Sequence, residues 1–228
     1  MPSLIELNNI HFSYPAHAPV LNGACLTLNE GERLSLTGAN GAGKSTLLRI
    51  AVGLLKPSLG SVCAFGQERR EEKDFHEVRR LAGYVFQDPD DQLFCPTVAE
   101  DVAFGPLNLG KTRDETMAIV DDVLARLHLT GFHDRITHKL SGGEKRLVTL
   151  AAVLAMEPKV LLLDEPSNAL DEAVTERLIE ILNDLPQSMI LVSHDPHFRR
   201  RIETRRLHLH DGQVSTPPEP KCKHAAST

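Results

Sequence analysis

The fold is decided by the stretch Gly38-Ala39-Asn40-Gly41-Ala42-Gly43-Lys44-Ser45-Thr46. It fits the phosphate-binding pattern of a glycine, four residues and then Gly-Lys-Ser, and it follows a strand-like apolar segment, residues 33–37. The glycines let the backbone wrap closely around phosphates, and N–H groups at the start of the next helix point at the anion. We expect Lys44 to reach the β- and γ-phosphates and Ser45 to ligate Mg²⁺. The stretch therefore predicts a nucleotide site rather than a plain glycine turn.

Short apolar runs and longer helical patterns alternate on both sides of this stretch. The runs at 33–37, 81–86, 160–163 and 189–192 are typical of buried strands, because each is short and bounded by Gly, Pro or charged residues. Segments 44–55, 114–127, 144–156 and 172–185 carry apolar residues at helical spacing. Strands alternating with helices indicate an α/β protein with a parallel sheet covered on both faces.

The segment from about 88 to 155 interrupts this alternation. Strand signals disappear there, and two helix starts carry a capping-box pattern, Thr112 with Glu115 and Ser141 with Glu144. We interpret 88–155 as a helical subdomain inserted into a single domain that covers residues 1–214. Residues 215–228 contain three prolines and no large apolar side chain, which predicts a disordered tail.

Two adjacent carboxylates, Asp164 and Glu165, follow the apolar run 160–163. The carboxyl ends of parallel strands form the sheet edge where ligands of such folds bind. Asp164 is expected to hold Mg²⁺, and Glu165 could deprotonate the water that attacks a γ-phosphate. Taken alone, such a pair is more often a solvated turn, but beside a phosphate-binding loop we favour the catalytic interpretation.

Ser141-Gly142-Gly143 begins a helix, so its hydroxyl and free N–H groups form a second potential anion site. A well-capped helix without ligand is the commoner meaning of a Ser-x-x-Glu pattern. The order of the segments argues otherwise, because this one precedes Asp164 by 164 − 141 = 23 residues, as it does in ATP-binding cassette proteins.

The sequence resembles the ATPase subunit of an ABC transporter from about residue 4 to residue 214. The resemblance implies a P-loop NTPase core with a parallel sheet, an N-terminal antiparallel β subdomain and the inserted helical subdomain. It implies ATP and Mg²⁺ as cofactors, a catalytic role for Glu165, His194 and Gln87, and Mg²⁺ bound by Ser45, Gln87 and Asp164. Tyr14 would stack on adenine. The implied ATP-binding residues are Tyr14, Gly38, Asn40, Gly41, Ala42, Gly43, Lys44, Ser45, Thr46, Ser141, Gly142 and Gly143.

Residues 85–110 narrow the resemblance to the ATPases of energy-coupling-factor importers. Glu144-Lys145-Arg146 is more similar to the cobalt and nickel members than to the vitamin members. The implied function is an ATPase that powers a cobalt or nickel importer by ATP-driven closure of a head-to-tail dimer with itself or a related ATPase. Integral-membrane subunits would dock near Gln87 to Phe94, so the chain would lie at the cytoplasmic face of the membrane.

The amino-acid composition is consistent with a transport ATPase, and three other functions remain as alternatives. The 228 residues carry 25 Lys and Arg against 31 Asp and Glu, a formal charge of −6, which argues against nucleic acid as a partner. No apolar run is long enough to span a bilayer. The alternatives are a vitamin importer, a soluble ABC protein without a transport role, and a small P-loop kinase, which would leave the Ser141 helix and His194 without a function.

Scattered cysteines and histidines predict no further metal centre. The four cysteines are Cys25, Cys63, Cys95 and Cys222, too far apart for a zinc site or a disulfide scaffold. Two close pairs, Cys222 with His224 and His208 with His210, offer two ligands each, which do not complete a site.

Overall fold

The computed structural model describes residues 2–216 and contains two β-sheets with helices packed around them. The first is antiparallel, with strand order β2-β1-β4-β5, where β1 is Ser3–Ser13, β2 Pro19–Asn29, β4 Leu59–Ala64 and β5 Gln67–Arg69. The second has the order β10-β9-β3-β8-β7-β6 and is parallel except for β10. Its strands are β3 Arg33–Thr37, β6 Ala82–Val85, β7 Val160–Asp164, β8 Ser188–Val192, β9 Arg205–His210 and β10 Gln213–Ser215.

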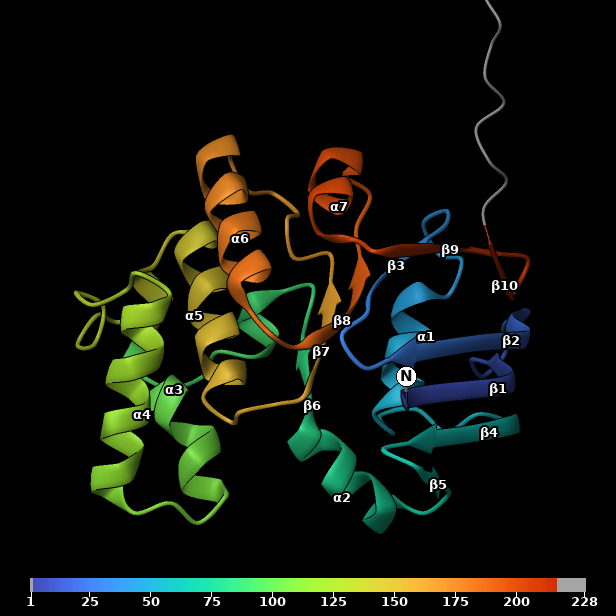
Figure 1. The fold of residues 1–228 in the computed structure, drawn as a ribbon, viewed down its shortest axis with the longest axis horizontal. Coiled ribbons are helices and arrows are strands. Elements are labelled where there is room, and N and C mark those ends of the chain that lie inside the picture. Colours follow the sequence, from blue (N-terminus) through green and yellow to red (C-terminus); the bar gives the residue numbers. More distant parts are fainter. Residues whose placement is uncertain (1, 217–228) are drawn as a thin grey trace, which may run out of the picture.

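Seven helices are found in the described residues. They are α1 Lys44–Ala51, α2 Glu72–Leu81, α3 Val98–Asn108, α4 Arg113–Arg126, α5 Gly142–Leu154, α6 Glu172–Asp184 and α7 Pro196–Ile202. Helices α3, α4 and α5 gather at one end of the molecule and the antiparallel sheet lies at the other (Figure 1). Every residue of β6, β7 and β8 is buried, as expected for strands covered on both faces.

The predicted fold class is confirmed: a parallel sheet with helices, an antiparallel sheet formed mainly by N-terminal strands, and a helical segment between β6 and β7. The exact bounds of the helical subdomain and of the 1–214 domain stay predictions. No helix among residues 2–216 is long and apolar enough to cross a membrane.

Two predicted boundaries are wrong. The helix predicted over 44–55 ends at Ala51, because Gly53 adopts a left-handed backbone with φ +72° that breaks the helix. Ser215, placed in the predicted tail, is the last residue of β10 and pairs with His208. The rest of the tail prediction, from residue 217, lies outside the described residues.

Candidate functional site

A cavity of about 610 Å³ opens where β3 and β7 end and α1 begins. It brings together residues that lie far apart in the sequence, from the antiparallel sheet, the phosphate-binding loop and the ends of β6, β7 and β8. The residues lining it are Tyr14, Val20, Asn40, Gly41, Gly43, Lys44, Ser45, Thr46, Gln87, Glu165, Asn168, Val192 and His194.

The loop from Gly38 to Gly43 adopts a backbone conformation that requires glycine at its first and last positions. Gly38 has φ +150°, and a Cβ there would lie 2.4 Å from the carbonyl oxygen of Leu209. Gly43 has φ +103°, and a Cβ there would lie 2.7 Å from Val20. Any side chain at either position would therefore be strained and would push the loop off the neighbouring strands.

Lys44 lies inside the loop, buried, with its Nζ donating to the carbonyl oxygens of Gly38 and Ala39, each at 2.9 Å. Burial lowers the pKa of this ammonium, and the carboxylates of Glu165 and Asp164 oppose that shift. The ammonium is thus held at the mouth of the loop, where the phosphates of a nucleotide are expected.

Asp164 is only 1% exposed, and both of its oxygens are bound. Oδ1 accepts from the Ser45 hydroxyl at 3.0 Å, and Oδ2 accepts from the Tyr84 hydroxyl at 2.8 Å. Burial, followed by the charge of Asp164, raises the pKa of Tyr84, so the phenol stays protonated and remains a donor. A hydroxyl and a carboxylate meeting at hydrogen-bond distance are hard oxygen ligands that suit Mg²⁺ bound jointly with phosphates.

Glu165 follows Asp164 with a different environment. Its φ is +49°, and its N–H donates to Val192 O at 2.8 Å, which turns the side chain from the strand direction toward the cavity. Oε2 accepts from the backbone N–H of His194 at 3.1 Å. Oε1 is buried without a hydrogen-bond partner among the described residues, although His194 Nε2 lies 3.2 Å away.

His194 Nε2 also lies 3.2 Å from Lys44 Nζ. An ammonium only donates, and a neutral imidazole nitrogen is either a donor or an acceptor. Nε2 can therefore accept from Lys44 or donate toward Glu165, but a single tautomer cannot do both. The side chains of Lys44, Glu165 and His194 therefore meet in one part of the cavity.

Tyr14 lies at the cavity wall, edge-on to Phe12 with 4.9 Å between ring centroids, and its hydroxyl contacts Thr46 Oγ1 at 3.1 Å. It therefore lies beside the phosphate-binding loop, where a stacked base could be held. Ala42, also predicted to bind ATP, is a partly buried residue packed against the core.

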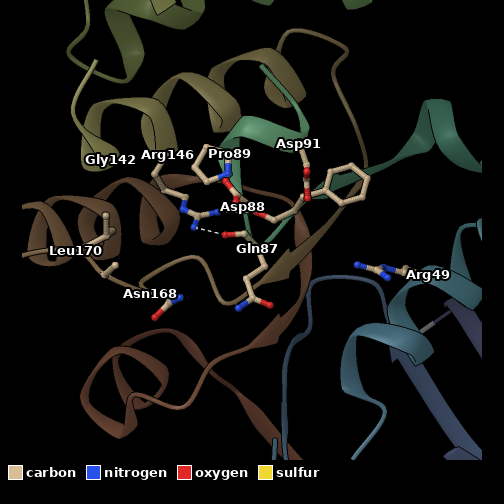
Figure 2. Close-up of a pocket in the computed structure, with 11 residues that line it drawn as sticks. Arg49, Gln87, Asp88, Pro89, Asp91, Gly142, Arg146, Asn168 and Leu170 are labelled. Atoms are coloured by element: carbon tan, nitrogen blue, oxygen red, sulfur yellow. Dashed lines mark hydrogen bonds between the residues drawn. The ribbon is translucent and has the colours of Figure 1, made fainter. Parts of the chain in front are cut away.

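Gln87 is exposed and lines two cavities, the one above and a neighbouring one of about 440 Å³ (Figure 2). The second cavity is also lined by Gly142 and by Asn168 to Leu170 from the loop after β7.

The segment 141–143 lies away from the phosphate-binding loop: among the described residues that line the first cavity, none comes from it. Ser141 is exposed and caps α5, with its Oγ accepting from Glu144 N at 3.3 Å and its N–H donating to Glu144 Oε2 at 2.8 Å. The segment predicted to form a second anion site therefore does not line the same cavity as the phosphate-binding loop.

Three residues around the site were missed from the sequence. Tyr84 holds Asp164, Gln92 bonds Tyr84 O and Phe86 N with its side-chain amide, and Arg146 bonds the backbone next to Gln87. No local sequence pattern predicts the contacts of Tyr84 and Gln92. The third was noted only as part of Glu144-Lys145-Arg146.

We compared the chain with protein families and with known proteins. The family described as ABC transporter matches residues 21–168. An energy-coupling factor transporter ATP-binding protein, EcfA of Methanothermobacter thermautotrophicus, is 42% identical over 92% of this chain and 69% of its own.

Solved structures agree. The cbiO1 protein of Clostridium perfringens, described as part of the ABC transporter complex cbiONQ, has a TM-score of 0.84 and 33% identity over 93% of this chain and 87% of its own. A dimeric ATP-binding cassette in a post-hydrolysis state with ADP and Pi has a TM-score of 0.83 and 27% identity over 93% of this chain and 98% of its own.

Proposed function

The chain belongs to the ABC transporter family and is an ATPase of that family, and from this premise we propose that it powers a membrane importer of cobalt or nickel ions. One observation carries the transport part of the proposal. The loop that places Gln87 in the nucleotide cavity continues to Phe94, which is 66% exposed and packs edge-on against exposed Phe104. This loop thus links the nucleotide site to an apolar surface that a partner can cover.

Hydrolysis is assigned to the residues of the first cavity. Glu165 takes the proton of the attacking water through its unpaired Oε1, and His194 contacts the γ-phosphate. Mg²⁺ would be held by Ser45, Asp164 and Gln87, and when bound it neutralises phosphate oxygens. Lys44 binds the β- and γ-phosphates, and Tyr14 stacks on the base.

The second surface implies a dimer. Because Ser141 to Gly143 lie outside the cavity of their own chain, they cap ATP bound to Lys44 of a second cassette. The solved relative that binds ADP and Pi is dimeric, which supports this arrangement. ATP binding then closes two copies head to tail, and hydrolysis releases them.

Docking of the membrane subunits is placed at residues 87–94. A cavity of about 490 Å³ is lined by Phe94, Ile136 and neighbouring residues, and it is suited to apolar side chains of a short helix. The exposed carboxylate of Asp91 in the same loop can pair with a basic residue of that helix, whereas Asp90 already pairs with Lys145. The chain would therefore be peripheral, at the cytoplasmic face of the membrane.

Deletion of the chain from its own cell tests the substrate. Cobalt or nickel accumulation, measured by mass spectrometry of washed cells, should fall and should return with the wild-type chain but not with Lys44→Ala. The names of the EcfA relatives support the alternative, an energy-coupling-factor importer of the vitamin type, only as far as the energy-coupling factor, because they name no substrate. Unchanged metal content with lost vitamin uptake would assign that function instead. Loss of neither would favour an ATPase without a transport role.

A further inference from the structure

Arg146 is a buried cation whose side chain bonds backbone rather than a carboxylate. It is 3% exposed, and it lies in the second turn of α5, the helix that Ser141 caps. Nη1 donates to Phe86 O and Nη2 to Gln87 O, each at 2.6 Å. Figure 2 shows this guanidinium against the backbone of Gln87. Among residues 2–216 it forms no ion pair within salt-bridge distance, so a permanently charged group is buried to hold two carbonyls.

The loop that Arg146 holds is fixed at further points. Lys145, the preceding residue of α5, places Nζ 2.6 Å from Asp90 Oδ1. Gln92 closes the loop on itself, because Nε2 donates to Tyr84 O at 3.0 Å and Oε1 accepts from Phe86 N at 3.1 Å. Asp88 accepts from the N–H of Asp90 at 3.0 Å. Lys145 and Arg146 together therefore tie residues 86–90 to α5.

These ties have a geometric consequence. The N-terminus of α5 carries Ser141, the surface for a second cassette's ATP, and its second turn grips the residue that lines the chain's own nucleotide cavity. A planar guanidinium with two parallel donors fixes both distance and orientation, whereas a flexible ammonium fixes neither. If α5 moved, the backbone of Gln87 would therefore move with it.

We propose that Arg146 is a positioning residue for hydrolysis, which locks the backbone of Gln87 to α5 so that both phosphate-contacting surfaces move as one body. The proposal rests on the proposed role of Gln87 in holding Mg²⁺ at the nucleotide cavity. Arg146 is not among the described residues that line the nucleotide cavity, so it would act through Gln87.

Hydrogen exchange of the isolated full chain tests the lock without any reference to transport. Arg146→Met removes the donors at nearly constant volume and should lower the protection of amides in residues 86–92 by about tenfold. Arg177→Met is the matched control, because the Arg177 guanidinium also bonds two carbonyls, Leu127 O at 2.7 Å and His128 O at 2.8 Å, within the same half of the molecule. It should leave residues 86–92 unchanged. Equal protection in Arg146→Met and wild type overturns the lock.

A double-mutant cycle then tests the positioning role, with ATP hydrolysis measured in complex with the membrane subunits. Arg146→Met alone should lower kcat by about tenfold with nucleotide affinity unchanged, since misplacement of a positioned group reduces the rate steeply. In the Gln87→Ala background the same substitution should cost less than about twofold, because the Gln87 side chain whose position Arg146 fixes through the backbone carbonyl is gone.

The same factor in both backgrounds means that Arg146 is merely structural and overturns the proposal. Arg146→Lys keeps the charge but places its donors on a single nitrogen, so it serves if the methionine variant does not fold, and it should recover only part of the rate. If Gln87→Ala hydrolyses ATP at the wild-type rate, the proposed role of Gln87 is wrong. Hydrogen exchange of residues 86–92 then still shows whether Arg146 holds the loop to α5.

Discussion

At the scale of single residues, Asp164 and Glu165 are chemically alike and adjacent, yet the fold gives them different environments. Asp164 ends β7 in extended backbone with both oxygens bound, which holds its carboxylate in one position. Glu165 adopts the left-handed region, at a cost of about 1 kcal/mol or more for a residue with a side chain, and keeps one oxygen unpaired. An unpaired oxygen is what a general base requires.

Glu165→Gln is expected to bind ATP like the wild type and to lower kcat by about 10²-fold or more, because an amide cannot accept the proton of water. ATPase assays with the membrane partner present measure the rate, and nucleotide titration of the isolated chain is the control. Wild-type turnover in this variant would show that another group activates the water.

Tyr84→Phe tests the support of Asp164. The variant loses a charge-assisted hydrogen bond inside the protein, so its free energy of unfolding at pH 7 should fall by about 1.5 to 3 kcal/mol. Tyr14→Phe is the control, since the Tyr14 hydroxyl contacts only the neutral hydroxyl of Thr46 in the described residues and should cost about 1 kcal/mol or less.

Tyr84→Phe is also expected to change how the free energy of unfolding depends on pH. The folded protein raises the pKa of Tyr84 above its ordinary value of 10.0, so the folded state holds this proton more tightly than the unfolded chain. The resulting stability is complete below pH 10 and is lost as the pH rises further. Urea unfolding from pH 8 to 11 should show a steeper decline for the wild type than for Tyr84→Phe. Parallel curves would contradict the shift.

At the scale of the elements, α4 and α5 begin with capping boxes of nearly identical geometry. Thr112 and Ser141 each accept from the N–H three residues on at 3.3 Å, and each donates its own N–H to the facing glutamate at 2.8 Å. The two caps share these bonds, although Thr112 Oγ1 also donates to Glu115 and Glu144 also pairs with Arg135. Only the cap on α5 is assigned a nucleotide contact.

Thr112→Ala and Ser141→Ala should each lower the free energy of unfolding by about 1 kcal/mol. Only Ser141→Ala should reduce ATP hydrolysis in the assembled transporter, because its hydroxyl is lost from the dimer site as well as from the cap. Denaturant melts and ATPase rates of the two variants measure the difference. Equal rates would reduce Ser141 to a helix cap.

At the scale of the whole molecule, the proposed dimer closure would bring two separated surfaces together. Glu165→Gln with ATP should trap the closed dimer and double the mass measured by light scattering, while Ser141→Arg in the same background should stay monomeric because the added side chain fills the capping site. A Glu165→Gln chain that stays monomeric with ATP, with and without its membrane partner, would count against the dimer.

Docking is tested by Phe94→Ala, which should weaken co-purification with the membrane subunits and uncouple transport while nucleotide binding by the isolated chain is retained. Leu59→Ala is the control, since Leu59 is similarly exposed, at 64%, but lies on β4 of the antiparallel sheet. A Phe94→Ala chain that assembles and transports normally would remove Phe94 from the interface.

Local patterns allowed much of this protein to be predicted. The phosphate-binding loop, the strand that ends in Asp164 and the caps of α4 and α5 were all predicted from residues within a few positions of one another, because their hydrogen bonds close over three or four residues. The parallel sheet followed from alternating apolar periods. Leu93 and Phe94 mark the limit of such patterns, because they are adjacent in one loop, yet Leu93 packs into the core and Phe94 is exposed.

What the sequence by itself determined is thus the set of groups that can bind phosphate and their order along the chain. Tertiary structure alone decided which groups support them: Tyr84 reaches Asp164 across 80 positions, and Arg146 reaches Gln87 across 59. Local patterns contain no trace of these contacts, since a buried tyrosine or arginine finds its partner only when strands and helices from distant segments pack together.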